Sequence, residues 1–498
     1  MTDPARSGQR LGSLAGKLLL VGLVNALAVY GLVATYAVRD WGIFAVILVA
    51  TAAVDYVYFS RRTLASRYLL PGLIFLLIFQ VYVVIYTAYA GFTNVGDGHN
   101  LDKPRALQHI LAVSEKRVPG SPPYKVQVLA GPDDRLHLLA TGPDGRTTLD
   151  GRPATGVPAD HRVLPFRDLV GRQQEVLALR VPLQDGSLRT EDGSTGYIAK
   201  PTLRYADDAL TDTVTGTVYR ATERGYFESA DGKVLTPGWK EVVGLDNYVR
   251  AFTDERLRAP LLSVFAWTFA FAALSVLTTF ALGLLLALTL NREGLRGRGI
   301  YRSLLVLPYA VPSFLSALVW TGMLNQSFGF VNHGLLGGAD IPWLNDATLA
   351  KVSVLLVNLW LGFPYMFLIC TGALQAVPAE VNEAARIDGA GPWQLFRRVT
   401  LPLLLVSTGP LLVASFAFNF NNFTVIYFVT GGGPNIPDAP ITLGSTDLLI
   451  SAVYKVAFGG AGREWGFACA MSTIIFLVVA AISAAGFRRT RALEETYS

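Results

Sequence analysis

The chain has 498 residues, of which 52% are hydrophobic and 16% charged, and its net charge is +5. Soluble globular domains average about 25% charged residues, so the composition indicates a membrane protein. The positive charge does not indicate nucleic-acid binding, because the sequence has no stripe of Lys and Arg with interleaved aromatic residues. Cys370 and Cys469 lie within apolar runs and are expected to pack as small apolar side chains.

Apolar runs long enough to cross a bilayer recur along the chain, since about 20 residues span roughly 30 Å of hydrocarbon. The first run follows three basic residues and has features of a cleaved signal peptide, but it continues to residue 38, so we expect it to be retained. The second run is short and contains Asp55. Eight spans are predicted, at about residues 17–38, 41–59, 69–91, 260–290, 303–325, 351–376, 401–428 and 465–487.

The Lys and Arg residues between these runs are unevenly distributed. They are concentrated in the segments that lie inside when the N-terminus is cytoplasmic, and they are few in the short outer loops. Short loops rich in Lys and Arg stay on the cytoplasmic side of the membrane. We therefore expect both termini and the polar loop at 378–402 to be cytoplasmic.

Residues 92–258 form a long hydrophilic insert between the third and fourth runs. Alternating apolar and polar residues indicate strands at 124–128, 136–140 and 217–220, separated by turns rich in Gly, Pro and Asp. A mostly β domain of about 165 residues is large enough to bury its own core, so we prefer this interpretation to disorder. The predicted fold class is an all-α polytopic membrane protein with a mostly β external domain. Its predicted domains are residues 1–91, 92–258 and 259–498.

The polar loop at 378–402 has the features of two short helices rather than a simple turn. Pro378 suits a first helical position, Gly389 suits a helix end with positive φ, and Pro392 suits the start of a second helix. An apolar face follows, formed by Trp393, Leu395 and Phe396. The loop is therefore expected to be a rigid projection that presses against another protein.

Neither a catalytic site nor a nucleotide site is predicted. Glu383 and Asp388 lie on a short exposed loop without a pocket and are poor candidates for an acid–base pair. The segment at 12–18 lacks the spacing and the hydroxyl of a phosphate-binding loop, and the five histidines show no metal-ligand spacing. If ATP drives this protein, another polypeptide binds it.

Two polar faces occur within the sixth and seventh runs, because residues at i, i+3, i+4 and i+7 share one side of a helix. The spacing joins Asn358, Leu361, Gly362 and Tyr365 in the sixth run, and Ser415, Phe418, Asn419 and Asn422 in the seventh. Amides are costly in hydrocarbon unless hydrogen-bonded, and beside aromatic rings they suit a sugar, whose hydroxyls pair with amides. The spacing alone leaves open that the amides only tie helices together. Gly362 and Pro364 are expected to weaken the sixth helix.

Several stretches resemble one family of transport proteins. The loop Glu383-Ala384-Ala385-Arg386-Ile387-Asp388-Gly389-Ala390-Gly391, with Val399-Thr400-Leu401-Pro402, resembles the EAA loop of ATP-binding-cassette (ABC) importer permeases. Over roughly residues 240–490, the chain resembles the larger membrane subunits of maltose-type ABC importers. The stretches that carry this resemblance are Tyr301–Phe314, Asn325–Gly329, Trp360–Met366 and Ser415–Phe423.

The resemblance implies a type I ABC importer permease core in the inner membrane, with an external insert that helps to hold a binding protein. Its implied partners are a second permease of the same fold, two ATPase subunits and a periplasmic sugar-binding protein. ATP and Mg would be bound by the ATPases, with no cofactor on this chain. Sugar contacts would come from the eight residues of the two polar faces. Coupling to an ATPase would use Glu383, Ala384, Ala385, Asp388, Gly389, Leu401 and Pro402.

The implied cargo is maltose, maltodextrin or a related α-glucoside, moved inward by alternating access. Another disaccharide such as trehalose has a similar pattern of hydroxyls and is the nearest alternative. An ion-coupled transporter would need acidic residues within the core spans, where the sequence has none apart from Asp55 in the second run. A membrane sensor would need a cytoplasmic signalling domain, and the inner segments are too short for one.

Overall fold

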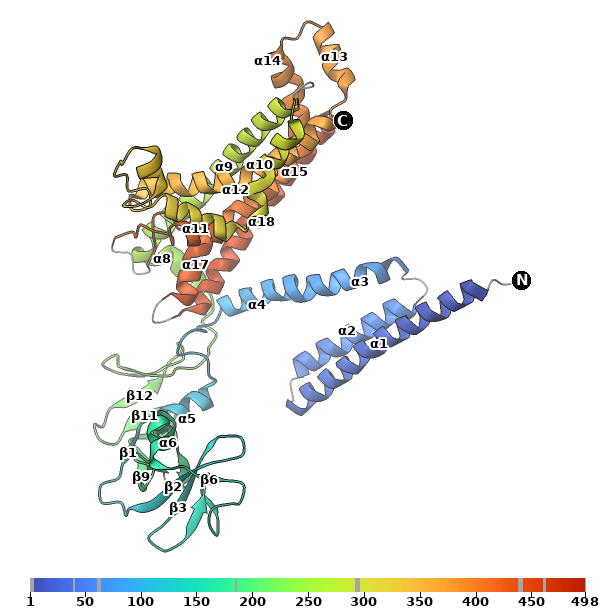
Figure 1. The fold of residues 1–498 in the computed structure, drawn as a ribbon. Coiled ribbons are helices and arrows are strands. Elements are labelled where there is room, and N and C mark those ends of the chain that lie inside the picture. Colours follow the sequence, from blue (N-terminus) through green and yellow to red (C-terminus); the bar gives the residue numbers. More distant parts are fainter. Residues whose placement is uncertain are drawn as a thin grey trace. The chain divides into compact units, whose positions relative to one another are not determined.

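The computed structural model describes residues 4–38, 41–60, 64–183, 186–291, 296–437, 442–459 and 463–497 (Figure 1). The chain forms two compact units, Met1–Tyr86 and Thr87–Ser498. The first unit contains α1 (Pro4–Val38), α2 (Trp41–Phe59), α3 (Leu64–Leu76), the π-helix η2 (Leu77–Val81) and the start of α4 (Tyr82–Gly91). Within this unit the Asn25 amide donates a 2.9 Å hydrogen bond to the Asp55 carboxylate, so the acidic residue of α2 has a polar partner on α1.

Within the described residues, five helical segments are long and apolar enough to cross a membrane. They are Gly72–Gly91, Glu255–Leu290, Ala347–Ala376, Pro392–Phe420 and Trp465–Arg491. Val21–Ala37 and Ile43–Phe59, within the first two predicted spans, are apolar but shorter. The chain is therefore polytopic, and the total of eight spans stays a prediction.

The fifth predicted span, 303–325, is wrong as a continuous helix. It consists of α10 (Arg298–Ala310) and α11 (Ser313–Met323), whose axes meet at 92°. Pro312 has no amide hydrogen to donate, and its ring disfavours a helical conformation at the residue before it. Val311 accordingly has a ψ of 132°, outside the helical region.

The seventh predicted span, 401–428, is also interrupted. The helix α15 (Leu401–Phe420) ends before a turn at Asn421, and α16 (Phe423–Val429) begins after Asn422. The Asn422 side chain accepts a hydrogen bond from the Val425 amide and caps α16. Asn422 therefore lies at a helix boundary and not on a continued face of α15.

The polar loop at 378–402 contains two helices as predicted, α13 (Ala379–Ile387) and α14 (Pro392–Leu395). Gly389 has a φ of +82°, which confirms the expected helix end, and Pro392 occupies the start of α14. Pro378 precedes α13 as its N-cap and is not its first helical residue. A π-helix, η4 (Phe396–Thr400), then leads into α15.

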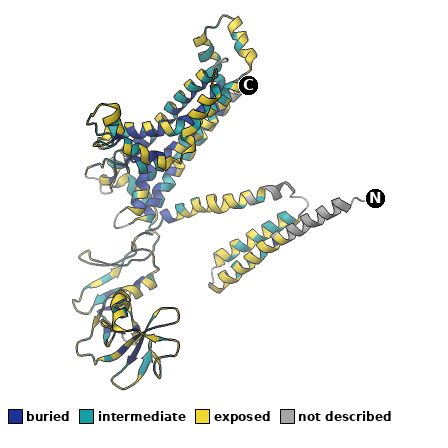
Figure 2. Ribbon diagram, viewed as in Figure 1, coloured by how far each residue is buried: buried dark blue, intermediate teal, exposed yellow. Residues whose placement is uncertain are grey.

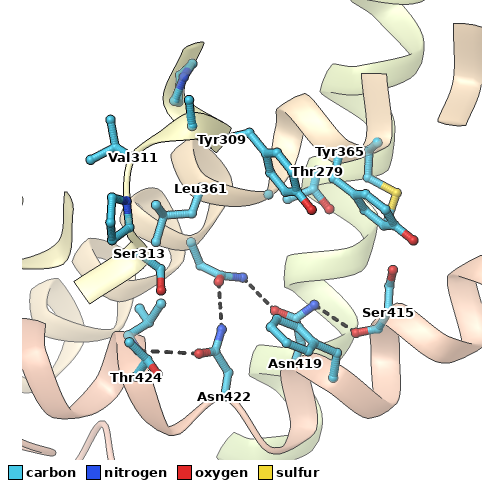
Figure 3. A pocket seen from close by; sticks show the side chains of 18 of the residues that line it. Thr279, Tyr309, Val311, Ser313, Leu361, Tyr365, Ser415, Asn419, Asn422 and Thr424 are labelled. Atoms are coloured by element: carbon cyan, nitrogen blue, oxygen red, sulfur yellow. Dashed lines mark hydrogen bonds between the residues drawn. The ribbon is translucent and has the colours of Figure 1, made fainter. Parts of the chain in front are cut away.

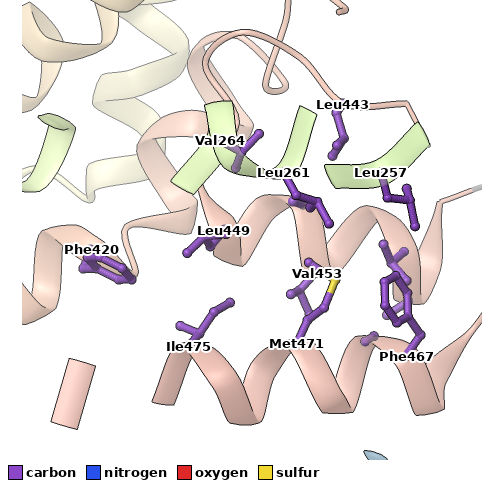
Figure 4. Close-up of a cluster of buried hydrophobic side chains, with 14 of the residues drawn as sticks. Leu257, Leu261, Val264, Phe420, Leu443, Leu449, Val453, Phe467, Met471 and Ile475 are labelled. Carbon is purple, nitrogen blue, oxygen red and sulfur yellow. The ribbon is translucent and has the colours of Figure 1, made fainter. Parts of the chain in front are cut away.

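The membrane core of the second unit is built around α9 (Glu255–Leu290), α12 (Ala347–Ala376), α15, α17 (Leu449–Phe458) and α18 (Trp465–Tyr497). Residues coloured as buried concentrate where these helices meet (Figure 2). One apolar cluster joins Leu261 of α9, Val453 of α17 and Met471 of α18 (Figure 4). The core is completed by α8 (Asp246–Thr253) and the π-helix η3 (Val331–Leu335).

Two glycines bring helices of this core unusually close together. A Cβ atom at Gly283 of α9 would lie 2.7 Å from the backbone of Met366 on α12. A Cβ atom at Gly409 of α15 would lie 2.7 Å from the Thr490 side chain on α18. Small residues at such contacts let helix backbones approach within a membrane. The pairs α9–α12 and α15–α18 are therefore tightly packed.

The sequence did not predict α17 or the buried ion pair at its start. The Asp447 carboxylate is fully buried and accepts hydrogen bonds from the Gly444 amide at 2.6 Å, the Ser451 hydroxyl at 2.8 Å and the Lys455 ammonium at 2.6 Å. A buried carboxylate needs such partners to stay charged. The segment before α17 is therefore held by charge as well as by apolar packing.

The insert is mostly β, as predicted. A nine-stranded sheet has the order β5-β4-β3-β2-β9-β8-β7, with β1 paired to β9 and β6 to β2, and a five-stranded sheet has the order β10-β11-β12-β13-β14. The predicted strands at 124–128, 136–140 and 217–220 correspond to β2, β3 and β12. The alternative of disorder is wrong for the part of the insert that the structure describes.

The elements of the insert have the following bounds. The first sheet contains β1 (Glu115–Arg117), β2 (Tyr124–Ala130), β3 (Leu136–Thr141), β4 (Thr147–Leu149), β5 (Arg152–Pro153), β6 (Arg162–Val163), β7 (Val181–Leu183), β8 (Gly186–Thr190) and β9 (Thr195–Pro201). The second contains β10 (Leu203–Ala206), β11 (Ala209–Asp212), β12 (Val218–Ala221), β13 (Phe227–Ser229) and β14 (Val234–Leu235). The helices are α5 (Lys103–Val113), α6 (Phe166–Gly171) and α7 (Gln173–Ala178).

Replacing Glu115 with Ala is expected to destabilise the first sheet. The Glu115 carboxylate is completely buried, and it accepts hydrogen bonds from Arg180 at 2.7 Å and from the buried Ser187 hydroxyl. Its removal leaves buried polar groups unsatisfied, which costs about 1–3 kcal/mol. Limited proteolysis of the full-length chain during a temperature ramp should show the insert cut at a lower temperature. Glu175→Ala, which breaks an exposed pair with Arg172, is the control and should change this temperature little.

Candidate functional site

A cavity of about 670 Å³ lies within the membrane core of the second unit (Figure 3). Residues from α9, α10, α11, α12, α15 and α16 line it. All eight residues of the two predicted polar faces are among them: Asn358, Leu361, Gly362, Tyr365, Ser415, Phe418, Asn419 and Asn422. The structure therefore brings the polar face of α12 next to that of α15 and α16, although α13 and α14 lie between them in the sequence.

The face on α12 is formed by an unbroken helix. Gly362 and Pro364 were expected to weaken it, but α12 runs from Ala347 to Ala376 without interruption. Gly362 instead serves close packing, because a Cβ atom there would lie 2.8 Å from the Thr279 side chain of α9. Asn358 and Tyr365 are thus held on a rigid element.

Three amide side chains form a connected hydrogen-bond network at the base of the cavity. Asn358 Nδ2 donates to Asn419 Oδ1 at 2.8 Å, and Asn422 Nδ2 donates to Asn358 Oδ1 at 2.9 Å. Asn419 Nδ2 donates to the Ser415 carbonyl at 2.8 Å. The three side chains are buried, with exposed fractions of 5% for Asn358, 8% for Asn419 and 7% for Asn422. The network ties α12 to the end of α15 and the start of α16.

The amide network also retains the capacity to bind a ligand. Each asparagine NH₂ group has two N–H donors, and the bonds above use one from each of the three residues. Asn358 and Asn419 both line the cavity. The two interpretations of the polar faces are therefore compatible, since the same amides tie the helices and leave donors for a hydroxyl group.

Aromatic side chains line the cavity beside these amides. Tyr365 is 36% exposed and Phe418 is 71% exposed. Pockets that combine apolar rings with a few placed polar groups are typical of small-molecule sites, with volumes of roughly 300–1,000 Å³. A polyhydroxylated ligand suits this lining, because its hydroxyls can pair with amides while its C–H groups lie against a ring.

The predicted coupling residues form a separate region, outside the residues that line the cavity. Glu383, Ala384 and Ala385 lie on α13, Asp388 and Gly389 follow its end, and Leu401 and Pro402 begin α15. Sequence reasoning did not single out Ile387, which is 85% exposed on α13. The sequence signal that would have identified Ile387 is a large apolar residue within a short helix that is otherwise polar.

Sequence reasoning also missed part of the cavity lining. The additional residues are Thr279, Pro308, Tyr309, Ala310, Val311, Pro312, Ser313, Met366, Ala414, Thr424 and Val425. Six of them, 308–313, belong to the junction of α10 and α11. Helical periodicity could not find these residues, because they lie where the helix is interrupted.

Comparison with known proteins identifies the class to which this fold and cavity belong. Residues 279–494 match the binding-protein-dependent transport system inner membrane component, and residues 74–152 match the N-terminal region of the transmembrane subunit in binding-protein-dependent ABC transporters. The chain is thus the permease subunit of a binding-protein-dependent ABC importer, a multi-pass inner-membrane protein and not an enzyme.

The particular family follows from relatives that match almost the whole chain. The maltose/maltodextrin transport system permease protein MalF of Salmonella typhi is 36% identical, over 95% of this chain and 96% of its own length. MalF of Escherichia coli K12 is 35% identical over the same shares. The chain belongs to the MalF family. A bacterial alginate ABC transporter structure aligns with 50% of the chain at 22% identity and a TM-score of 0.43, so the assignment rests on the sequence relatives.

Proposed function

We propose that the chain carries maltose, maltodextrin or a related α-glucoside through the cavity bounded by Asn358, Asn419 and Asn422. The observation that carries this proposal is the connected amide network beside Tyr365 and Phe418 in one cavity. The names of the MalF relatives support the same class of cargo. The substrate-binding residues would be Asn358, Leu361, Gly362, Tyr365, Ser415, Phe418, Asn419 and Asn422.

Sugar binding would exchange hydrogen bonds within the amide network. A sugar hydroxyl both donates and accepts, so it can insert between Asn358 and Asn419 without leaving either amide unsatisfied. Replacing one set of hydrogen bonds with another costs little net free energy. The network would therefore hold the cavity together when it is empty and bind the sugar when it is loaded.

Like other binding-protein-dependent permeases, the chain works with ABC ATPase partners. The proposed assembly contains a second permease of the MalG type, two ATPases of the MalK type that hold ATP and Mg, and a periplasmic sugar-binding protein. The projection of α13 and α14 would be the coupling element, with Glu383, Ala384, Ala385, Asp388, Gly389, Leu401 and Pro402 at or beside the ATPase contact. Exposed Ile387 and Trp393 support this role, because they offer apolar surface to a partner.

The proposed topology has eight spans with both termini in the cytoplasm. Its domains would be the three N-terminal spans at 1–91, a periplasmic domain at 92–258 inserted after the third span, and a permease core at 259–498. The strands of the insert, all between Glu115 and Leu235, support this division. The concentration of Lys and Arg in the inner segments supports the orientation.

The rival functions have less support from the described residues. An ion-coupled transporter would use a membrane carboxylate, and Asp55 is hydrogen-bonded to Asn25 outside the cavity lining. A membrane sensor gains no support from the cavity, which lies within the permease core. Trehalose or another disaccharide stays the closest alternative cargo, because its hydroxyls suit the same amides.

Uptake by the reconstituted complex tests this proposal. Proteoliposomes that contain both permeases and the ATPases, with the binding protein added outside, should accumulate maltose or maltotriose when ATP is enclosed. Trehalose and sucrose serve as comparison sugars in the same assay. Binding titrations of the cognate binding protein with these sugars separate its selectivity from that of the cavity. Accumulation of none of the four sugars would contradict the proposed cargo.

A further inference from the structure

A second cavity, of about 640 Å³, lies where three membrane-spanning helices begin or end. It shares no lining residue with the cavity that contains the amide network. Most of its lining comes from residues 94–99, after the span Gly72–Gly91, from 243–254, before Glu255–Leu290, and from 463–467, around the start of Trp465–Arg491. The second cavity therefore lies at the surface of the membrane.

The helix α8 is fixed beside the second cavity by one of its faces. Asn247 Nδ2 donates a 3.0 Å hydrogen bond to the Gly91 carbonyl at the end of α4. Arg250 pairs with Glu464 and lies over the Phe467 ring, beside the start of α18. These contacts hold α8 in one orientation on the membrane core.

The opposite face of α8 is apolar and uncovered. Leu245, Val249 and Phe252 follow i, i+4 and i+7 spacing, and all three side chains are exposed. Since α8 leads directly into the span α9, this face lies at the boundary of the bilayer. An amphipathic helix at that boundary buries its apolar face among lipid headgroups and acyl chains.

The second cavity contains unpaired charges of both signs. Arg224 and Arg463 line it, and neither has an ion-pair partner among the described residues. Asp97 and Asp246 also line it, and their carboxylates have no basic partner in the same part of the chain. Val249 belongs both to this lining and to the apolar face of α8, so the two surfaces adjoin.

The remaining charges of the lining are already engaged. Arg250 pairs with Glu464, and the Asp254 carboxylate accepts a 3.0 Å hydrogen bond from the Arg256 amide and caps α9. The unpaired charges therefore sum to zero, which favours a zwitterionic ligand over an anionic one. His99 adds a polar group, because its buried Nε2 atom has no hydrogen-bond partner within the described residues.

We propose that the second cavity and the apolar face of α8 together bind one phospholipid with an ethanolamine headgroup. Arg224 and Arg463 hold the phosphate, Asp97 and Asp246 hold the ammonium, and the acyl chains lie against α8. An ethanolamine ammonium has N–H groups that the carboxylates can accept, whereas the trimethylated nitrogen of choline has none. The inference goes beyond sugar transport and does not depend on the cargo.

Photolabelling of the full complex tests this lipid site. The complex is placed in nanodiscs that contain phosphatidylethanolamine, phosphatidylcholine or phosphatidylglycerol with a photoactivatable diazirine in one acyl chain. After irradiation, mass spectrometry measures the labelled peptide that contains α8. Phosphatidylethanolamine should label it about tenfold more than either other lipid, because hydrogen bonds to charged groups contribute roughly that factor or more.

Two variants separate the two ends of the headgroup. Arg463→Gln should lower labelling by phosphatidylethanolamine about tenfold, and Asp97→Asn should remove most of its advantage over phosphatidylcholine. Arg204→Gln, on β10 and outside the lining of the second cavity, is the matched control and should change neither value.

Equal labelling of α8 by the three lipids in the wild type overturns the proposal, because α8 would then contact only bulk lipid. Unchanged labelling in both Arg463→Gln and Asp97→Asn overturns the headgroup site. If no lipid labels α8 and Phe252→Ser weakens binding of the sugar-binding protein, the apolar face docks a protein and the proposal is wrong. None of these measurements uses sugar uptake, so their failure leaves the proposed sugar site untouched.

Discussion

Asn419→Ala should abolish most sugar uptake while the transporter complex still assembles. Asn419 accepts a hydrogen bond from Asn358 at 2.8 Å and donates to the Ser415 carbonyl at 2.8 Å, so its amide connects α12 to the backbone of α15. Its loss leaves the buried Nδ2 group of Asn358 without that partner. Such a group costs about 1–3 kcal/mol, so we expect uptake to fall about 10- to 100-fold.

The neighbouring Asn421 provides a matched control for this experiment. Its exposed side chain donates a 3.4 Å bond to the Ala417 carbonyl, and it is not among the residues that line the cavity. Asn421→Ala should therefore retain uptake close to that of the wild type. Assembly of both variants is checked by co-purification with the second permease and the ATPases. Asn419→Ala at the wild-type rate would show that the amide network does not bind the cargo.

Gly389→Val should uncouple ATP hydrolysis from transport. Gly389 ends α13 with a φ of +82°, where a β-branched residue is strongly disfavoured. A Cβ atom there meets nothing within 4 Å, so the expected effect comes from the backbone and not from a steric clash. Relieving the strain would move the end of α13 and its exposed Ile387. We expect the amount of sugar transported per ATP hydrolysed to fall about tenfold.

Two further variants separate backbone strain from a general effect of mutating the loop. Gly391 lies two residues away with a φ of −66° and open space around it, so Gly391→Ala should couple normally. Gly389→Asn should be milder than Gly389→Val, because asparagine tolerates positive φ. Uptake and ATP hydrolysis are measured in the same proteoliposomes. If Gly389→Val transports as much sugar per ATP as the wild type, the coupling assignment is wrong.

Much of the cavity could be predicted from the sequence because its polar residues occur at helical spacing. Asn358 and Tyr365 share a face of α12, and amides within an apolar run are conspicuous since they need partners there. Gly389 was predictable for a similar reason, because a glycine after a short amphipathic helix suits positive φ. In each of these places, local sequence and tertiary structure agree.

The departures from prediction are at helix interruptions. The bend at Val311 and Pro312 has a local cause that the sequence contains, but hydropathy averages over it and predicts one span. The turn at Asn421 was missed in the same way, since the apolar residues continue into α16. Tyr309 and Ser313 could not be assigned to the cavity without the bend. The pairing of Asp447 with Lys455 depends on the packing of α17, which lies in a segment expected to be a loop.

The close contacts at Gly283 and Gly409 limit how this transporter can move. Glycine at these positions lets α9 approach α12, and α15 approach α18, more closely than any side chain would allow. An apolar cluster also joins α9 to α17 and α18, and the Asn358–Asn419 hydrogen bond joins α12 to α15. We therefore expect these helices to move together during alternating access and not to separate at the amides. The surface at which the pore opens would then lie at the outer boundary of this helix group.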